Sequence, residues 1–190
     1  MRDTLIVVAA YDDTYLDNLP SLAKGGHCVR MDTSAGGHPS AAFIRAYREH
    51  NYPSYLFLQD SLKGQVPDVV APFKAQGRPV VAWGVFHPLF FDSVEQQVWV
   101  ESQFPLGRPP YGIFGPVFYA TRDAMRRAEP FFPATPADKL EAQGTERAWA
   151  YTFMHAKVPV GALGGMTTDG VRPNLFPENK TFLKTFGNRQ

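Results

Sequence analysis

Three short apolar runs, each leading into an acidic residue, alternate with two helix-like segments over the first 62 residues. The runs are Thr4–Asp13, Cys28–Ser34 and Tyr55–Ser61, and the segments between them are Thr14–Lys24 and Pro39–His50. Strands that alternate with helices in this way are joined by right-handed crossovers and form a parallel sheet. The sequence therefore predicts an α/β fold in one domain, with a mixed, mostly parallel sheet flanked by helices.

The two helix-like segments carry signals of different strength. Pro39 suits the first position of a helix, and Phe43 and Tyr47 recur at helical spacing after it. Pro20 falls inside the first segment, where it should kink or shorten the helix.

Acidic residues stand where the predicted strands end, at Asp12, Asp13, Asp32 and Asp60. The carboxyl ends of parallel strands meet at one edge of the sheet, where open α/β folds bind ligands. Four carboxylates there would repel each other unless a cation or the hydroxyl groups of a ligand engaged them. Asp60 could hold Mg²⁺ or Mn²⁺ and, through it, a diphosphate. The alternative is that Asp60 only serves the turn after its strand, since Asp is a favoured turn residue.

Composition narrows the function classes. The chain has 190 residues with a net charge of +1 and contains no basic run, so nothing favours a nucleic-acid partner. Its one cysteine, Cys28, excludes an internal disulfide framework and fits a reducing compartment. The apolar runs are shorter than the roughly 20 residues of a membrane span, and acids arrive too early for a secretory signal. We expect a cytoplasmic protein without a membrane span, and the oligomeric state stays open.

The second half of the sequence is less regular. We expect strands at Pro79–Phe86, Ile113–Ala120 and Val158–Leu163, and helices at Asp92–Phe104, Arg122–Glu129, Pro136–Gly144 and Thr145–Ala156. Pro116 cannot donate a ladder hydrogen bond, so the strand that contains it is predicted to be bulged or at an edge. Gly144 is predicted to end one helix, and Glu146 then stands in the first turn of the next. Its alternative role there is to complement the helix dipole.

The order of these elements resembles that of GT-A glycosyltransferases, here family 2-like, which take a sugar from a nucleotide donor. Three stretches carry the resemblance: Ala10-Tyr11-Asp12-Asp13, Met31-Asp-Thr-Ser34 with Gly36-Gly37 after it, and Phe57-Leu-Gln-Asp-Ser61. It implies a nucleotide-diphospho-sugar transferase-like fold. It also implies that Ala10, Tyr11, Asp12 and Asp32 bind the nucleotide, and that Asp60 binds the metal and the diphosphate.

Two departures from the family are visible. Gln59 replaces one acid of the usual Asp-x-Asp motif, which makes the motif degenerate. The family also usually has an additional strand and helix between the positions of Asp32 and Asp60. The resemblance therefore implies a shortened domain whose metal dependence is open.

The resemblance extends to the acceptor side of the chain. Tyr111–Pro116 is similar to the family's acceptor segment, and Gly144–Trp149 to the acid that opens a helix. It implies that Glu146 is the base that activates the acceptor hydroxyl. Gly115, Trp83 and His87 are the predicted acceptor-binding residues. Residues 1–62 would then form a nucleotide-binding half, residues 78–166 an acceptor and catalytic half, and residues 167–190 a C-terminal tail.

The predicted function is transfer of a sugar from a nucleotide sugar to an unknown acceptor, assisted by a metal. Two alternatives are open. The first is a catalytically silent nucleotide- or sugar-binding domain, which Gln59 favours. The second is a metal-dependent hydrolase that uses the same carboxylates.

Overall fold

The computed structural model describes residues 3–33, 38–86, 89–104, 107–113, 117–165 and 181–184. Two predicted acceptor residues, His87 and Gly115, and most of the tail lie outside the described residues.

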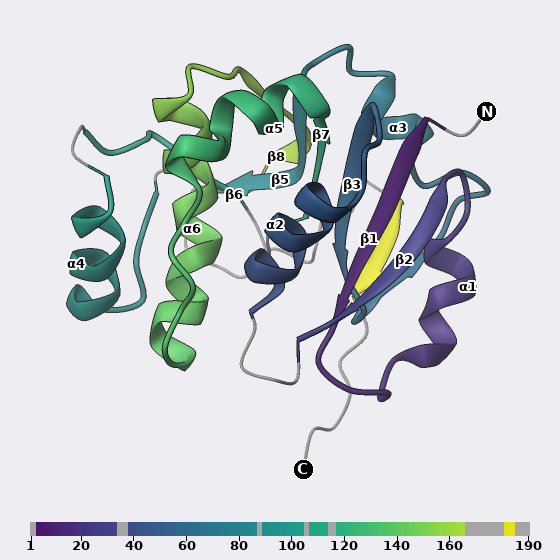
Figure 1. Cartoon of the computed structure of the whole chain (residues 1–190), viewed down its shortest axis with the longest axis horizontal. Helices are drawn as coiled ribbons and strands as arrows, with labels where there is room; N and C mark the ends of the chain where they lie inside the picture. The colour runs from purple at the N-terminus through teal and green to yellow at the C-terminus, as the bar shows by residue number, and fades with distance from the viewer. Residues whose placement is uncertain are drawn as a thin grey trace.

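A seven-stranded mixed sheet forms the centre of the described part of the chain (Figure 1). Its strands are β1 (Thr4–Ala10), β2 (His27–Asp32), β3 (Ser54–Gln59), β5 (Val80–Phe86), β6 (Gly112–Ile113), β7 (Phe118–Thr121) and β8 (Val160–Gly165). The order is β2-β1-β3-β7-β5-β6, and β8 also pairs with β5. β1 is parallel to β2 and β3, and β5 is parallel to β8, whereas β6 and β7 run antiparallel to their neighbours. The predicted mixed, mostly parallel α/β sheet is confirmed.

Helices cover both faces of this sheet (Figure 1). They are α1 (Leu19–Leu22), α2 (Pro39–Glu49), α3 (Ala71–Lys74), α4 (Val94–Ser102), α5 (Arg122–Ala128) and α6 (Lys139–His155), with 3₁₀ turns η1 (Leu16–Asn18) and η2 (Glu129–Phe131). A separate pair of strands, β4 (Leu62–Gly64) and β9 (Phe182–Lys184), is antiparallel.

Alternating residues of the strands divide the core into two layers. On one face, Phe57 and Phe118 of the sheet pack against Phe43 of α2 and Trp149 of α6. On the other face, residues such as Ile6 and Leu58 pack against side chains of α1 and α3. Burial on both faces explains why β1 and β3 are continuous apolar runs rather than alternating ones.

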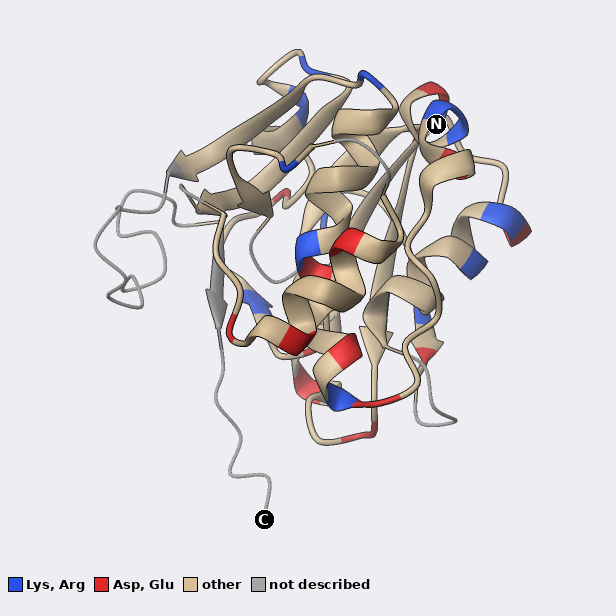
Figure 2. Cartoon of the chain, turned by 90° about the vertical axis from the view of Figure 1, so that its left-hand side faces the viewer, with Lys and Arg blue, Asp and Glu red and all other residues tan. Residues whose placement is uncertain are grey.

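Charged positions are mixed on the surface. Figure 2, viewed from the side of α4, shows basic and acidic positions interspersed over the helices and loops. Among the described residues, no helix combines the length and the apolar character needed to cross a membrane.

Three sequence predictions need correction or refinement. The predicted strand Ile113–Ala120 forms two strands: β6 lies at the end of the sheet order, whereas β7 lies between β3 and β5 in the middle of the sheet. Gly144 does not end a helix, because α6 runs continuously from Lys139 to His155. The segment after β1 is broken into η1 and the short α1, with Pro20 in the first turn of α1, as the proline predicted.

Candidate functional site

The order in which the chain adds strands to the sheet reverses at β1, because β2 and β3 lie on opposite sides of it. The chain leaves β1 for β2 on one side, and α2 then carries it back to β3 on the other side. The connections at such a switch point diverge to opposite faces of the sheet and leave a crevice outside the carboxyl ends of the strands. The pocket described next lies at this point.

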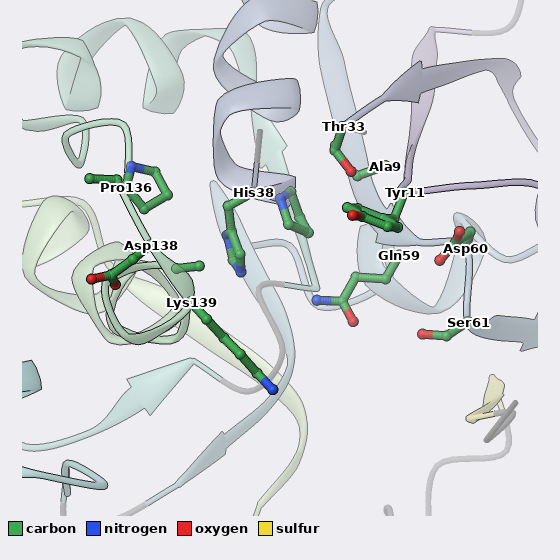
Figure 3. A pocket seen from close by; sticks show the side chains of 13 residues that line it. Ala9, Tyr11, Thr33, His38, Gln59, Asp60, Ser61, Pro136, Asp138 and Lys139 are labelled. Atoms are coloured by element: carbon green, nitrogen blue, oxygen red, sulfur yellow. The ribbon is translucent and has the colours of Figure 1, made fainter. Parts of the chain in front are cut away.

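The pocket has a volume of about 540 Å³, which is within the usual size of small-molecule sites. It is lined by Ala9, Tyr11, Thr33, His38, Pro39, Gln59, Asp60, Ser61, Pro136, Ala137, Asp138, Lys139 and Ala142 (Figure 3). Strand ends therefore form one side, and the first turns of α2 and α6 form the other.

The strand side carries the polar end of β3. Asp60 is 6% exposed, and its backbone is fixed on both sides. The Asp60 N–H donates to the carbonyl of Ala9 at 3.0 Å, and the side-chain amide of Asn18 donates to the Asp60 carbonyl at 2.9 Å. Tyr11 is 53% exposed and lies near Gln59 in Figure 3, so it offers an aromatic face to a ligand.

The helix side begins with a well-capped α6. The Asp138 carboxylate accepts from the Glu141 N–H at 2.9 Å, and the Glu141 carboxylate accepts from the Ala137 N–H at 2.6 Å. Lys139 is the first helical residue, and its side chain extends toward the strand side of the pocket (Figure 3). The start of a long helix carries partial positive charge, so this side favours an anion.

His38 joins the two helices at the pocket. Its Nδ1 accepts from the Ser40 N–H at 3.5 Å as the N-cap of α2, and lies 2.8 Å from the Thr145 hydroxyl of α6. Burial lowers the pKa of His38 to about 4, so the ring is neutral at pH 7. It can exchange hydrogen bonds with a ligand but adds no charge to the pocket.

The other predicted nucleotide residues stand beside the pocket rather than in its lining. Ala10 is buried, and its carbonyl accepts from the Thr33 N–H at 2.8 Å. Asp12 is exposed and accepts from the Thr14 N–H at 2.8 Å. Asp32 is exposed at the end of β2, and its carbonyl accepts from Arg45 at 3.0 Å. Asp60 is the one member of the predicted acidic edge that lines the described pocket.

The predicted catalytic and acceptor residues are dispersed. Glu146 lies inside α6 rather than in its first turn, one turn beyond the pocket residue Ala142, and its carboxylate is 3.6 Å from the Arg147 guanidinium. Its alternative role as a dipole partner at a helix start is therefore wrong. Trp83 is 0% exposed in the core between the sheet and α3, so it has no surface to offer an acceptor.

The pocket offers oxygen ligands to a metal ion, but few of them. Among the described residues, no three His, Cys, Asp or Glu side chains are grouped closely enough to hold one. The Asp60 carboxylate, with the Gln59 amide and the Ser61 hydroxyl beside it, supplies the oxygen donors that Mg²⁺ and Mn²⁺ prefer. This set fits a cation that takes its remaining ligands from bound phosphates.

His38 and Lys139 were missed from the sequence as pocket residues, although signals for both were present. Pro39 marked a helix start, and the residue before such a proline is the N-cap. Asp138 and Glu141 have the three-residue spacing of a capping box, which marks a helix that begins at Lys139.

Comparison with solved structures finds many chains of similar fold, among them the following two. One is CMP:2-keto-3-deoxy-manno-octonic acid synthetase complexed with CTP, with 9% identity over 86% of this chain and 90% of the other, and a TM-score of 0.41. Another is a nucleotidyl transferase from Methanothermobacter thermautotrophicus, with 11% identity over 84% and 86% of the two chains and a TM-score of 0.43. No protein-family model and no curated protein matches the sequence. At these low scores the site has to be interpreted from its own residues.

Proposed function

We propose that the protein binds a nucleotide sugar in this pocket and transfers the sugar to an acceptor hydroxyl. One observation carries the proposal: the pocket joins the polar strand ends at the switch point to the starts of two helices and a lysine. Helix starts and Lys139 suit a diphosphate, while Gln59, Asp60 and Ser61 suit hydroxyl groups. A volume of about 540 Å³ has room for both parts of such a ligand.

The nucleoside is proposed to lie against Tyr11. The exposed ring can stack on a base, and Thr33 lines the pocket beside it. Asp12 directly follows Tyr11 in the sequence, and Asp32 directly precedes Thr33. A nucleoside that extends past Tyr11 and Thr33 would therefore reach both carboxylates. A Mg²⁺ or Mn²⁺ ion at Asp60 would offset charge on the leaving diphosphate.

The transfer step needs a base for the acceptor. In the proposed reaction the acceptor oxygen bonds to the anomeric carbon, and the bond from that carbon to the diphosphate oxygen breaks with its electron pair. The hydroxyl proton passes to the Glu146 carboxylate. Glu146 lies four residues after the pocket residue Ala142, on the same face of α6 and one helical turn further along, so an acceptor that extends beyond the described pocket would reach it.

A thermal-shift screen of nucleoside diphosphates and nucleotide sugars, followed by product analysis, tests the proposal. A donor at 100 times its dissociation constant should stabilise the fold by about 2.7 kcal/mol. Asp60→Asn should reduce that shift, whereas Asp123→Asn, an exposed acid on α5, should leave it unchanged. Failure of every nucleotide to stabilise the protein would contradict the proposal.

Product analysis then separates the possible activities. A transferase gives a glycosylated acceptor, a hydrolase gives free sugar, and a binding domain gives neither. Glu146→Gln should keep donor binding and lose transfer by roughly 10²- to 10⁴-fold. Normal transfer by this variant would place the base elsewhere.

The second candidate is a nucleotide-sugar-binding domain without catalysis. It is favoured by the position of Glu146, which does not belong to the described pocket lining and is ion-paired with Arg147. Donor binding without any product from a broad set of acceptors would support this candidate.

A further inference from the structure

Within the described part of the chain, the pocket lining contains one Lys or Arg side chain, Lys139, at the start of α6. The side chain is exposed and lines the pocket. Among the residues that the structure describes, Lys139 forms no ion pair. Its positive charge is therefore available to a ligand.

The carboxylates nearest to Lys139 in the sequence are engaged elsewhere. Asp138 accepts from the Glu141 N–H, and Glu141 accepts from the Ala137 N–H. Figure 3 shows the Asp138 carboxylate on the opposite side of the helix start from the Lys139 ammonium group. Both acids stabilise the first turn of α6, so neither competes with a ligand for the lysine.

The backbone at two helix starts adds partial positive charge to that of Lys139. α6 has 17 residues and α2 has 11, and both begin at the pocket. Each helix start directs partial positive charge toward it. Opposite them, the strand side offers one carboxylate, Asp60, with Gln59 at the position where a second acid would strengthen a cation site. A lone carboxylate binds a divalent cation weakly, whereas an ammonium group is a compact, permanently available partner for phosphate.

We propose that Lys139, together with the helix starts, neutralises the diphosphate of the bound ligand, so that donor binding does not require a divalent cation. The proposal rests on the proposed nucleotide-sugar function and names the group that holds its anionic part. When the ligand binds without a cation, the Asp60 carboxylate accepts hydrogen bonds from the ligand's hydroxyl groups, and a bound cation would act only in the transfer step.

Calorimetric titration with UDP, GDP, ADP, CDP and inorganic pyrophosphate tests this directly, once in EDTA and once with Mn²⁺. The wild-type protein should bind at least one probe with similar affinity in both buffers. Lys139→Met keeps the length of the side chain and removes the charge, and it should weaken binding on the order of 10- to 100-fold, the loss of one charge-assisted hydrogen bond. Lys139→Arg should retain most of the affinity.

Lys74→Met is the matched control, because Lys74 is an exposed lysine at the end of α3, outside the pocket lining. It should bind like the wild type, and all variants should melt near the wild-type temperature without ligand. Binding that requires Mn²⁺, or binding that is unchanged in Lys139→Met, would overturn the proposed role of Lys139 but not the proposed function. Absence of binding by every probe in both buffers would overturn the proposed function as well.

Discussion

At the scale of single residues, the ionisation of His38 is set by its position between two helices. The ring caps α2 through Nδ1 and meets the Thr145 hydroxyl of α6 at 2.8 Å. Burial removes water from the ring and so disfavours its charged form. The folded structure therefore favours the neutral ring.

His38 should make the fold sensitive to acid below pH 6.5. Its pKa is lowered from 6.5 to about 4, so the unfolded chain takes up a proton before the folded protein does. The free energy of unfolding should therefore fall as the pH drops from about 6.5 to about 4, by up to about 3 kcal/mol, and this loss is absent above pH 6.5. Urea unfolding at several pH values measures it.

The comparison that isolates this effect is with His38→Asn, which retains a capping side chain but cannot titrate. Its stability should fall less steeply over the same interval. Gln143→Ala, at an exposed position that does not titrate, should keep the wild-type slope. Parallel losses in the wild type and His38→Asn would refute the prediction.

The sequence located some site residues and not others for a physical reason. Asp60 was predicted because the end of a buried parallel strand must emerge at the ligand-binding edge of the sheet, and Tyr11 because the resemblance to GT-A glycosyltransferases implied it. Asp12 and Asp32 share that edge, but a strand pattern does not show which side chain beyond the end of the strand points into a pocket. His38 and Lys139 come from helix starts, whose distance from the strands is fixed by tertiary packing.

At the scale of elements, α6 shows how packing overrides a local signal. Gly144 was interpreted as a helix stop, yet the helix continues through it, next to α4. A β-carbon at Gly144 would lie 2.9 Å from the Trp99 ring and 3.1 Å from a Val100 methyl group. The glycine is therefore needed for the close approach of the two helices, which sequence periodicity does not reveal.

Gly144→Ala should destabilise the protein despite the better helix propensity of alanine. The propensity gain is about 1 kcal/mol, whereas overpacking against Trp99 and Val100 costs about 1–3 kcal/mol. We expect a net loss of up to about 2 kcal/mol in urea unfolding. Gln143→Ala, at the exposed neighbouring position, should change stability by less than about 0.5 kcal/mol. In a Trp99→Ala background the loss at Gly144 should become smaller, since only the contact with Val100 remains; an unchanged loss would assign it to another cause.

At the scale of the whole molecule, the pocket joins parts of the chain that are distant in sequence. Gln59 and Asp60 come from the predicted nucleotide-binding half, and Lys139 and Ala142 come from the predicted catalytic half. The alternation of strands and helices predicted the sheet of the first half and its ligand-binding edge. It could not predict that α6 closes the pocket, because that contact depends on tertiary packing, in which Trp149 of α6 meets Phe118 of β7.

A ligand in this pocket must contact both halves at once, which gives the last prediction. Hydrogen exchange should slow together in residues 59–61 and 137–142 when a nucleoside diphosphate binds. The first N–H groups of a helix have no partner within the helix, and since Asp138 accepts from the Glu141 N–H, those of Lys139 and Leu140 gain most from a bound ligand. Where exchange requires ligand release, it should slow up to about 100-fold at 100 times the dissociation constant.

Peptides from β8 should not change, since none of the described lining residues comes from that strand. The parent nucleoside, which lacks the diphosphate, should protect residues 137–142 much less. Protection of only one of the two segments would mean that the nucleotide binds elsewhere on the molecule.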